Sequence, residues 1–115
     1  MKRPADLPTV PKHLGPESKE FFSRIVGTFE LETHHLKLLR LACEAYDRTQ
    51  EARKILAKEG LTVRDAHGGI KTHPAVAIER DSRLAFARLV REIGLPSDAD
   101  EEAPRAPAIQ GRYRR

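Results

Sequence analysis

The stretch that most constrains the fold of this chain is residues 60–75, GLTVRDAHGGIKTHPA, which separates two helix-like segments. Apolar and polar residues alternate before the Gly68-Gly69 pair, and a second short strand can follow it. The two glycines can adopt the positive φ angles that a tight turn requires. The stretch therefore predicts a small β-hairpin at residues 61–72. Pro74 then predicts the start of a new helix, because proline suits the first helical position.

The segment before the hairpin predicts a long amphipathic helix. It begins at a cap formed by Glu32 or Thr33, runs to Glu59 and ends at Gly60. At 1.5 Å per residue this helix is about 40 Å long. A helix with so wide an apolar face needs more partners than two shorter helices provide, so the pattern favours self-association. Its apolar positions form two adjoining stripes, Leu36, Leu39, Cys43 and Tyr46, and Leu38, Ala42, Ala45, Ala52 and Leu56.

Two shorter helices flank this long one. The first runs from Glu17 to about Glu30, and the other runs from Pro74 to Ile93 and ends at Gly94. Four arginines lie within an arc of roughly 140° on the outer side of the later helix, where we favour a solvated face over a phosphate-binding stripe. The apolar residues are Phe21, Phe22, Ile25, Val26 and Phe29 in the first helix and Ala75, Ile78, Phe86, Leu89 and Ile93 in the other, and the arginines are Arg80, Arg83, Arg88 and Arg91.

We predict one small, mainly α-helical domain with a terminal segment on each side. Residues 1–15 are rich in proline, which removes backbone donors and favours extended conformations, so they predict a flexible arm and not a packed element. Residues 16–95 form the helical core, which includes the hairpin. Residues 96–115 combine the acidic run DADEE with the basic run GRYRR and offer almost nothing to bury, so they predict a disordered charged tail.

Composition narrows the classes of function. The net charge of +4 lies mainly in the helical middle of the chain, which permits nucleic-acid binding but is also common in proteins that bind none. Cys43 is the only cysteine, so no internal disulfide can form, and its place in an apolar helical pattern predicts a packing role. The longest apolar runs are a few residues, which predicts neither a membrane span nor a signal peptide.

No motif in the sequence predicts catalysis, a cofactor or a metal. The HGGIKT stretch fails as a phosphate-binding loop, because Gly68 and Gly69 are adjacent and Ile70 separates them from the lysine. His34 and His35 are neighbours on a helix, so we expect their rings to point about 100° apart and not to hold one metal together. No serine, cysteine or carboxylate pair has the spacing of a nucleophile and its base. We therefore predict a protein that is not an enzyme.

The order of features resembles the small subunit of phage terminases of the P27 type. The resemblance covers about residues 8–96 and is most specific at the hairpin and the Lys-x-His-Pro-Ala that follows it. His73 departs from the asparagine common at this position in the family, although either residue can cap a helix. The tail also departs, because residues 96–99 lack the arginine that usually follows. The best-matching residues are Leu39, Ala42, Tyr46, Asp47, Ala52, Gly60, Gly69, Lys71, His73, Pro74, Ala75, Leu89, Gly94 and Leu95.

The resemblance implies a DNA-packaging adaptor in the cytoplasm of a bacterial host. Such a protein binds double-stranded phage DNA, assembles into a homo-oligomeric ring of more than four subunits and passes the DNA to a separate large subunit, which carries the ATPase and the nuclease. In a ring the hairpin would reverse the chain, so that the third helix packs antiparallel on the second, while the hairpin edges meet an adjacent subunit.

The resemblance does not settle where DNA binds, so the DNA and oligomerisation candidates are chosen from the residues themselves, and only the tail contact with the large subunit is implied by the resemblance. For DNA we expect phosphate contacts, first from the arm and first helix and then from the hairpin. Assembly would use apolar positions of the two longer helices, and the tail would contact the large subunit or DNA. The candidates are Lys12, Lys19, Arg24, Arg64 and Lys71 for DNA; Leu36, Leu39, Tyr46, Leu56, Ile78, Phe86 and Leu89 for oligomerisation; and Arg112, Tyr113, Arg114 and Arg115 in the tail.

Two other functions fit the same sequence. A small dimeric transcriptional regulator with a helical DNA-reading unit would have a similar length and charge. A purely structural interaction module would bind no nucleic acid. The oligomeric state separates the first two, because a regulator should be a dimer and a packaging adaptor a larger ring.

Overall fold

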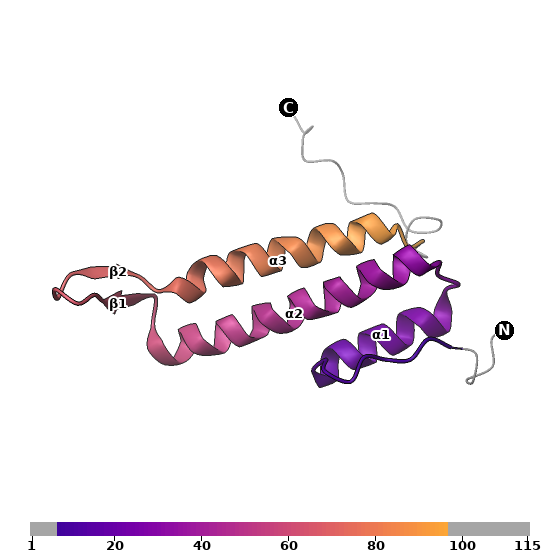
Figure 1. Cartoon of the computed structure of the whole chain (residues 1–115), viewed down its shortest axis with the longest axis horizontal. Helices are drawn as coiled ribbons and strands as arrows, with labels where there is room; N and C mark the ends of the chain where they lie inside the picture. Colours follow the sequence, from indigo (N-terminus) through magenta and orange to yellow (C-terminus); the bar gives the residue numbers. More distant parts are fainter. Residues whose placement is uncertain (1–6, 97–115) are drawn as a thin grey trace, which may run out of the picture.

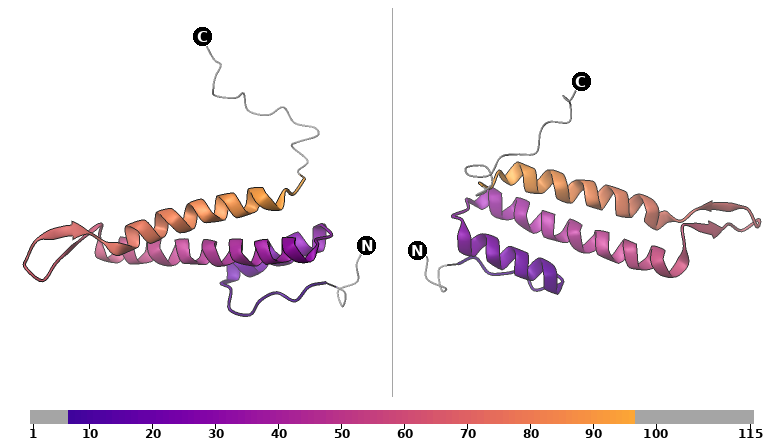
Figure 2. Two further views of the ribbon diagram at one scale, coloured as in Figure 1. Left: turned by 45° about the horizontal axis from the view of Figure 1, so that its top comes forward. Right: turned by 180° about the vertical axis from the view of Figure 1, so that it is seen from behind.

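The computed structural model describes residues 7–96, which form three helices and one small hairpin (Figure 1). The elements in chain order are α1 (Pro16–Thr28), α2 (Thr33–Glu59), β1 (Thr62–Arg64), β2 (Ile70–Thr72) and α3 (Pro74–Ile93). In both views of Figure 2, α2 and α3 lie antiparallel and side by side, α1 lies against the N-terminal half of α2, and the hairpin projects from the opposite end. The predicted mainly α fold is confirmed. None of the helices in residues 7–96 combines the length and apolar character that a membrane span requires.

The junction between α2 and α3 is fixed by His73. Its Nδ1 accepts a hydrogen bond from the backbone N–H of Ala75 (2.9 Å), so His73 caps α3 as an asparagine would. Because Nδ1 accepts, the neutral ring carries its proton on Nε2, which donates to Glu59 Oε1 (2.8 Å) at the end of α2. Gly60, with φ +86°, ends α2 as predicted. One buried side chain thus starts α3 and ties it to the last residue of α2.

The hairpin turn is organised by an aspartate. Asp65 Oδ1 accepts hydrogen bonds from the backbone N–H groups of His67 (2.9 Å) and Gly69 (2.8 Å). Of the two glycines, Gly68 alone has a positive φ, at +82°. Gly69 is needed for a different reason, because a Cβ there would lie 2.9 Å from Asp65 Oδ2. The expectation of a positive φ at both glycines is therefore wrong for Gly69.

The hydrophobic core lies at the end of the molecule opposite the hairpin. Leu39 and Cys43 of α2 are fully buried there, and residues of α1 and the end of α3 pack around them. The expectation of an unpacked arm is wrong for its last residues, because Leu14 is 4% exposed and joins this core. The predicted disordered tail lies outside the described residues. The core cluster is Leu14, Phe22, Ile25, Val26, Leu39, Cys43 and Ile93.

Leu39 and Leu41 offer a matched test of this core. Leu39 is 0% exposed and Leu41, two residues along α2, is 50% exposed. Replacing Leu39 with alanine should lower the free energy of unfolding by about 3 kcal/mol, because it leaves a cavity as well as removing buried methyl groups. Replacing Leu41 with alanine should cost less than about 1 kcal/mol. Urea unfolding followed by circular dichroism measures both, and similar losses would contradict the burial described here.

Candidate functional site

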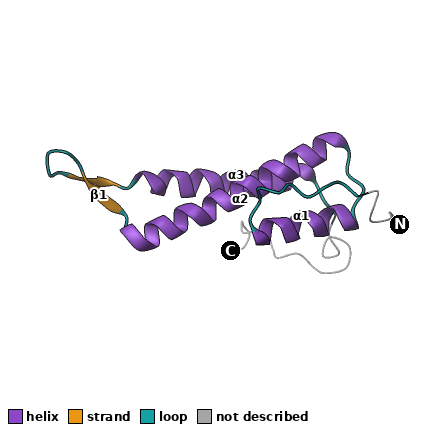
Figure 3. Ribbon diagram, turned by 60° about the horizontal axis from the view of Figure 1, so that its bottom comes forward, coloured by secondary structure: helices purple, strands orange, loops and turns teal. Residues whose placement is uncertain are grey.

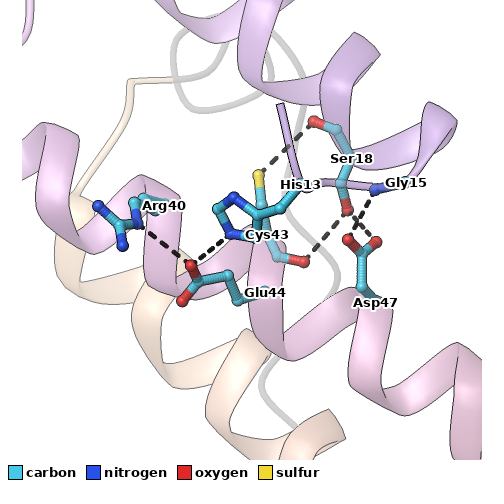
Figure 4. A network of polar contacts seen from close by, with 7 residues as sticks. All are labelled: His13, Gly15, Ser18, Arg40, Cys43, Glu44 and Asp47. Atoms are coloured by element: carbon cyan, nitrogen blue, oxygen red, sulfur yellow. Dashed lines mark hydrogen bonds and ion pairs between the residues drawn. The ribbon is translucent and has the colours of Figure 1, made fainter. Parts of the chain in front are cut away.

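A polar network anchors the N-terminal arm and α1 to α2 (Figure 4). The carboxylate of Asp47 accepts from the backbone N–H of Gly15 through Oδ2 (2.8 Å) and from Ser18 Oγ through Oδ1 (2.7 Å). Cys43 Sγ donates to the carbonyl of Ser18 (3.6 Å). Gly15 allows the close approach, because a Cβ there would lie 3.2 Å from Asp47 Oδ1. The aspartate therefore fixes where the arm ends and α1 begins.

A second carboxylate, Glu44, holds the arm one turn earlier on α2. His13 Nε2 contacts Glu44 Oε2 at 2.7 Å, and Arg40 Nε donates to the same oxygen at 3.1 Å. Burial acts to raise the pKa of Glu44, but the hydrogen bonds from His13 and Arg40 outweigh it, so the pKa lies below its ordinary value. Lys12 is exposed beside His13, so this contact sets the position of one predicted DNA-binding residue.

The basic residues predicted to bind DNA fall in two separate places. Lys12, Lys19 and Arg24 are exposed on the arm and α1, and Arg24 pairs with Glu20 (3.3 Å). Arg64 and Lys71 are exposed on the hairpin, at the other end of the molecule (Figure 3). The strand register pairs Arg64 with Ile70 and Val63 with Lys71, so the two basic side chains leave opposite faces of the hairpin.

The four arginines of α3 are all exposed, and two are compensated by acids. Arg80 pairs with Asp81 (3.1 Å) and Arg83 with Glu79 (3.2 Å). Glu79 also accepts from Arg53 of α2 (3.1 Å), which is the first cause of its lowered pKa. Sequence reasoning missed this bridge because it joins residues from different helices. Within residues 7–96, the other two arginines, Arg88 and Arg91, form no ion pair.

Most of the residues predicted to act in oligomerisation pack against other residues of the same chain. Leu39 is fully buried, so its side chain has no surface to offer a second subunit in this conformation. Tyr46 and Phe86 pack on each other, with ring centroids 5.5 Å apart. Ile78 remains 46% exposed, and Leu36, Leu56 and Leu89 are half-buried. Sequence reasoning did not select the other exposed large apolar residues of the described range 7–96, which are Leu41, Ile55, Leu61, Ile70 and Leu84.

The sequence spacing of two of these residues could have identified them as exposed. Leu41 and Ile55 are two heptads apart, so they lie within about 40° of each other on α2. They lie beyond the stripe that packs on α3, on the side of α2 that faces away from the stripe that packs on α1. An apolar pair on a third side of one helix indicates a surface that the monomer leaves uncovered.

An apolar hollow of about 210 Å³ opens between α1, α2 and α3. Its aromatic walls are Phe21, Tyr46 and Phe86, and Glu17 lies at its edge, where its Oε1 accepts from the Tyr46 hydroxyl (3.1 Å). Burial first, and then this hydrogen bond, raises the pKa of Tyr46. Burial, helped by two nearby carboxylates, raises the pKa of the Cys43 thiol to about 11. The thiol therefore stays protonated at neutral pH, which agrees with the predicted packing role.

The histidine pair at the start of α2 differs from expectation. The ring centroids of His34 and His35 are 4.0 Å apart, so the prediction that the rings diverge is wrong. Both rings turn toward Glu32, whose backbone N–H donates to His35 Nδ1 (3.3 Å) and whose carboxylate lies 3.6 Å from His34 Nδ1. One ligand atom from each residue lies within 4.8 Å of the others. The contacts of both histidines with Glu32, the N-cap residue of α2, explain why the three side chains lie together.

Glu44 gives the arm contact a predictable pH dependence. A carboxyl whose folded pKa is lowered stabilises the fold fully above its ordinary pKa of 4.5 and loses that contribution as the pH falls through the folded value. Replacing Glu44 with glutamine should therefore lower the free energy of unfolding at pH 7 by about 0.5–1 kcal/mol. The difference from the parent protein should vanish at lower pH, as shown by urea unfolding between pH 2 and pH 7.

The control for this prediction is Glu51, which is exposed on the same helix and has no cationic partner within residues 7–96. Replacing Glu51 with glutamine should leave stability unchanged. A loss in the Glu44 variant that persists undiminished at acid pH would contradict the assigned role of its carboxylate.

Comparison with known proteins gives one match. The family model described as phage terminase, small subunit, matches residues 19–106, which cover most of the chain and all of α2, the hairpin and α3. The match bears out the resemblance at the level of that family and does not specify the P27 type. The searches of curated proteins and of solved structures found no match. The tail candidates, Arg112, Tyr113, Arg114 and Arg115, lie outside the described residues.

Proposed function

This chain belongs to the small-subunit family of phage terminases, which gives it a part in phage genome packaging, and we propose from this premise that it is a DNA-binding, ring-forming adaptor. It binds phage DNA in the cytoplasm of the bacterial host and delivers it to the large subunit, which hydrolyses ATP and cuts DNA. The adaptor itself performs no catalysis. The observation that carries the proposal is the family match over residues 19–106.

Self-assembly is supported by the apolar surface that the monomer leaves uncovered. Within residues 7–96, six large apolar side chains are between 41% and 68% exposed, and the two most exposed, Leu61 and Ile70, lie on the hairpin or directly before it. The core lies at the other end, where α1 covers part of α2. Neighbouring subunits would cover this surface in a homo-oligomer of more than four chains. The exposed residues are Leu41, Ile55, Leu61, Ile70, Ile78 and Leu84.

DNA binding is supported by exposed cations that the fold holds in place. Lys12 and Lys19 have no acidic partner within residues 7–96, and the network around Asp47 and Glu44 fixes the backbone that carries them. Such residues contact phosphates, which gives strong salt dependence and little base specificity. Arg24, although paired with Glu20 on the surface, can exchange that weak partner for a phosphate. The charged tail supplies the contact with the large subunit or a further contact with DNA.

The native mass tests the assembly. Light scattering on a sizing column at moderate salt should give a single species above 52 kDa, which is four times the chain mass of 13.0 kDa. A dimer of about 26 kDa, twice the chain mass, would favour a transcriptional regulator. A monomer that DNA does not assemble would contradict the ring.

The DNA contacts are tested by reversing three charges. Replacing Lys12, Lys19 and Arg24 with glutamate should weaken binding of duplex DNA at low salt by at least about tenfold and reduce the salt slope of log K by about 2 to 3, because three phosphate contacts are lost. Fluorescence anisotropy with labelled DNA at several salt concentrations measures both quantities.

A matched control separates a local site from net charge. Replacing three exposed residues of α2, Lys37, Arg48 and Lys58, with glutamate changes the net charge by the same amount. This control should lose clearly less affinity and keep the parent salt slope. Equal losses of affinity in the two variants would mean that DNA binding responds to overall charge alone. If the variant with Lys12, Lys19 and Arg24 replaced binds DNA as tightly as the parent, the arm and α1 do not form the DNA site.

A further inference from the structure

The hairpin carries two of the most exposed apolar side chains in the described part of the chain. Ile70 is 68% exposed and Leu61 is 65% exposed. The two strands have three residues each, and they project beyond the ends of α2 and α3 (Figures 1 and 3). A two-stranded hairpin is only marginally stable by itself in water. A projecting hairpin with apolar side chains on its surface therefore needs a partner to cover it.

The strand register places Ile70 beside a positive charge. Ile70 and Arg64 are direct cross-strand partners, so their side chains share one face of the hairpin. Arg64 donates to the carbonyl of Gly68 (3.1 Å) and pairs with no carboxylate among residues 7–96. This face presents one branched apolar side chain and one guanidinium group, and Lys71 points away from it.

The aromatic hollow between the three helices has the complementary chemistry. Its volume of about 210 Å³ exceeds the roughly 150 Å³ of a cavity that accepts benzene, so it can take one branched aliphatic side chain. Its walls are aromatic and its edge carries Glu17. The adjoining hollow shares Glu17 and adds the carboxylates of Asp47 and Glu51 against the single ammonium of Lys54. The pocket is therefore apolar inside and has one carboxylate, that of Glu17, at its rim.

We propose that Ile70 of one subunit inserts into this aromatic pocket of a second copy of the chain, and that Arg64 pairs with Glu17 at the rim. The contact is between subunits, because the hairpin points away from α1 and lies at the opposite end of its own chain (Figure 2). Each subunit offers one hairpin and one pocket. In the proposed ring of more than four chains the contact is head-to-tail, so each subunit inserts its hairpin into one neighbour and receives the hairpin of the other. The inference rests on the self-assembly in the proposed function and names its interface.

This interface changes the role of one predicted residue. Arg64 acts between subunits and not on DNA, while Lys71 stays on the free face of the hairpin. It also gives Tyr46 and Phe86, which were predicted to act in oligomerisation, a part in assembly as walls of the pocket.

Disulfide trapping tests the contact directly. Cys43 is the only cysteine, so a C43A background allows clean introduction of one cysteine pair, I70C with F86C. Under mild oxidation this variant should give a ladder of covalent multimers on a non-reducing gel. The control pair, I70C with L84C, places the second cysteine on an exposed position of the same helix outside the pocket and should give no ladder.

The native mass of the same samples separates the hypothesis of self-assembly from the hypothesis of the hairpin contact. A parent protein that remains a monomer with and without DNA contradicts self-assembly and the interface together. An assembled I70C/F86C variant that gives no ladder, or no more than the control pair, overturns the hairpin contact and leaves the ring standing.

A charge swap tests the interface without changing Cys43. R64E and E17R should each weaken assembly at low salt by about five- to tenfold in dilution experiments, because each places like charges at the rim. The double variant, R64E with E17R, should return to within about twofold of the parent, since the pair is restored with its charges exchanged. Single variants that assemble like the parent, or a double variant weaker than both, would overturn the proposed pairing.

Discussion

The structure depends on α2, because the most extensive helix–helix contacts, those with α3 and with α1, are both made by this helix. One of its apolar stripes packs on α3 along its length, and the other receives α1 near Leu39 and Cys43. These two residues are the largest side chains that are fully buried. Every other element is placed by its relation to this helix, including the hairpin, which extends from its C-terminal end. Loss of packing along α2 would therefore remove the support of both the arm and the hairpin.

Polar contacts then decide the details that apolar packing leaves open. Asp47 and Glu44 hold the last residues of the arm against α2, and His73 joins the end of α2 to the start of α3. All three are partly or fully shielded from water, where a hydrogen bond with a charged partner is worth more than on an open surface. The molecule thus has a well-packed end with fixed cations and an opposite end where the two most exposed apolar residues, Leu61 and Ile70, remain uncovered. This asymmetry agrees with the proposed self-assembly.

Sequence patterns predicted the helices and the hairpin well, but they predicted less well which individual side chains are buried and what those side chains contact. The end of α2 and both ends of α3 followed from Gly60, Pro74 and Gly94, because these residues act through local backbone geometry. The arm was predicted to be unpacked, and the structure buries Leu14, because proline content reports backbone preference and not what a nearby core can accept. The apolar stripes were predicted to serve oligomerisation, but helical periodicity cannot say whether a stripe meets the same chain or another.

The sequence by itself determined the mainly α class, the hairpin at residues 61–72 and the resemblance to the family that the match then bore out, because these follow from local conformation and residue spacing. Only the tertiary structure decided which apolar side chains are covered and which are left for a partner. It also decided that Glu79 joins two helices, that His34 and His35 lie together, and that Phe21, Tyr46 and Phe86 enclose a pocket. Those outcomes depend on distances between residues that lie far apart along the chain or on side-chain rotamers, neither of which a linear pattern specifies.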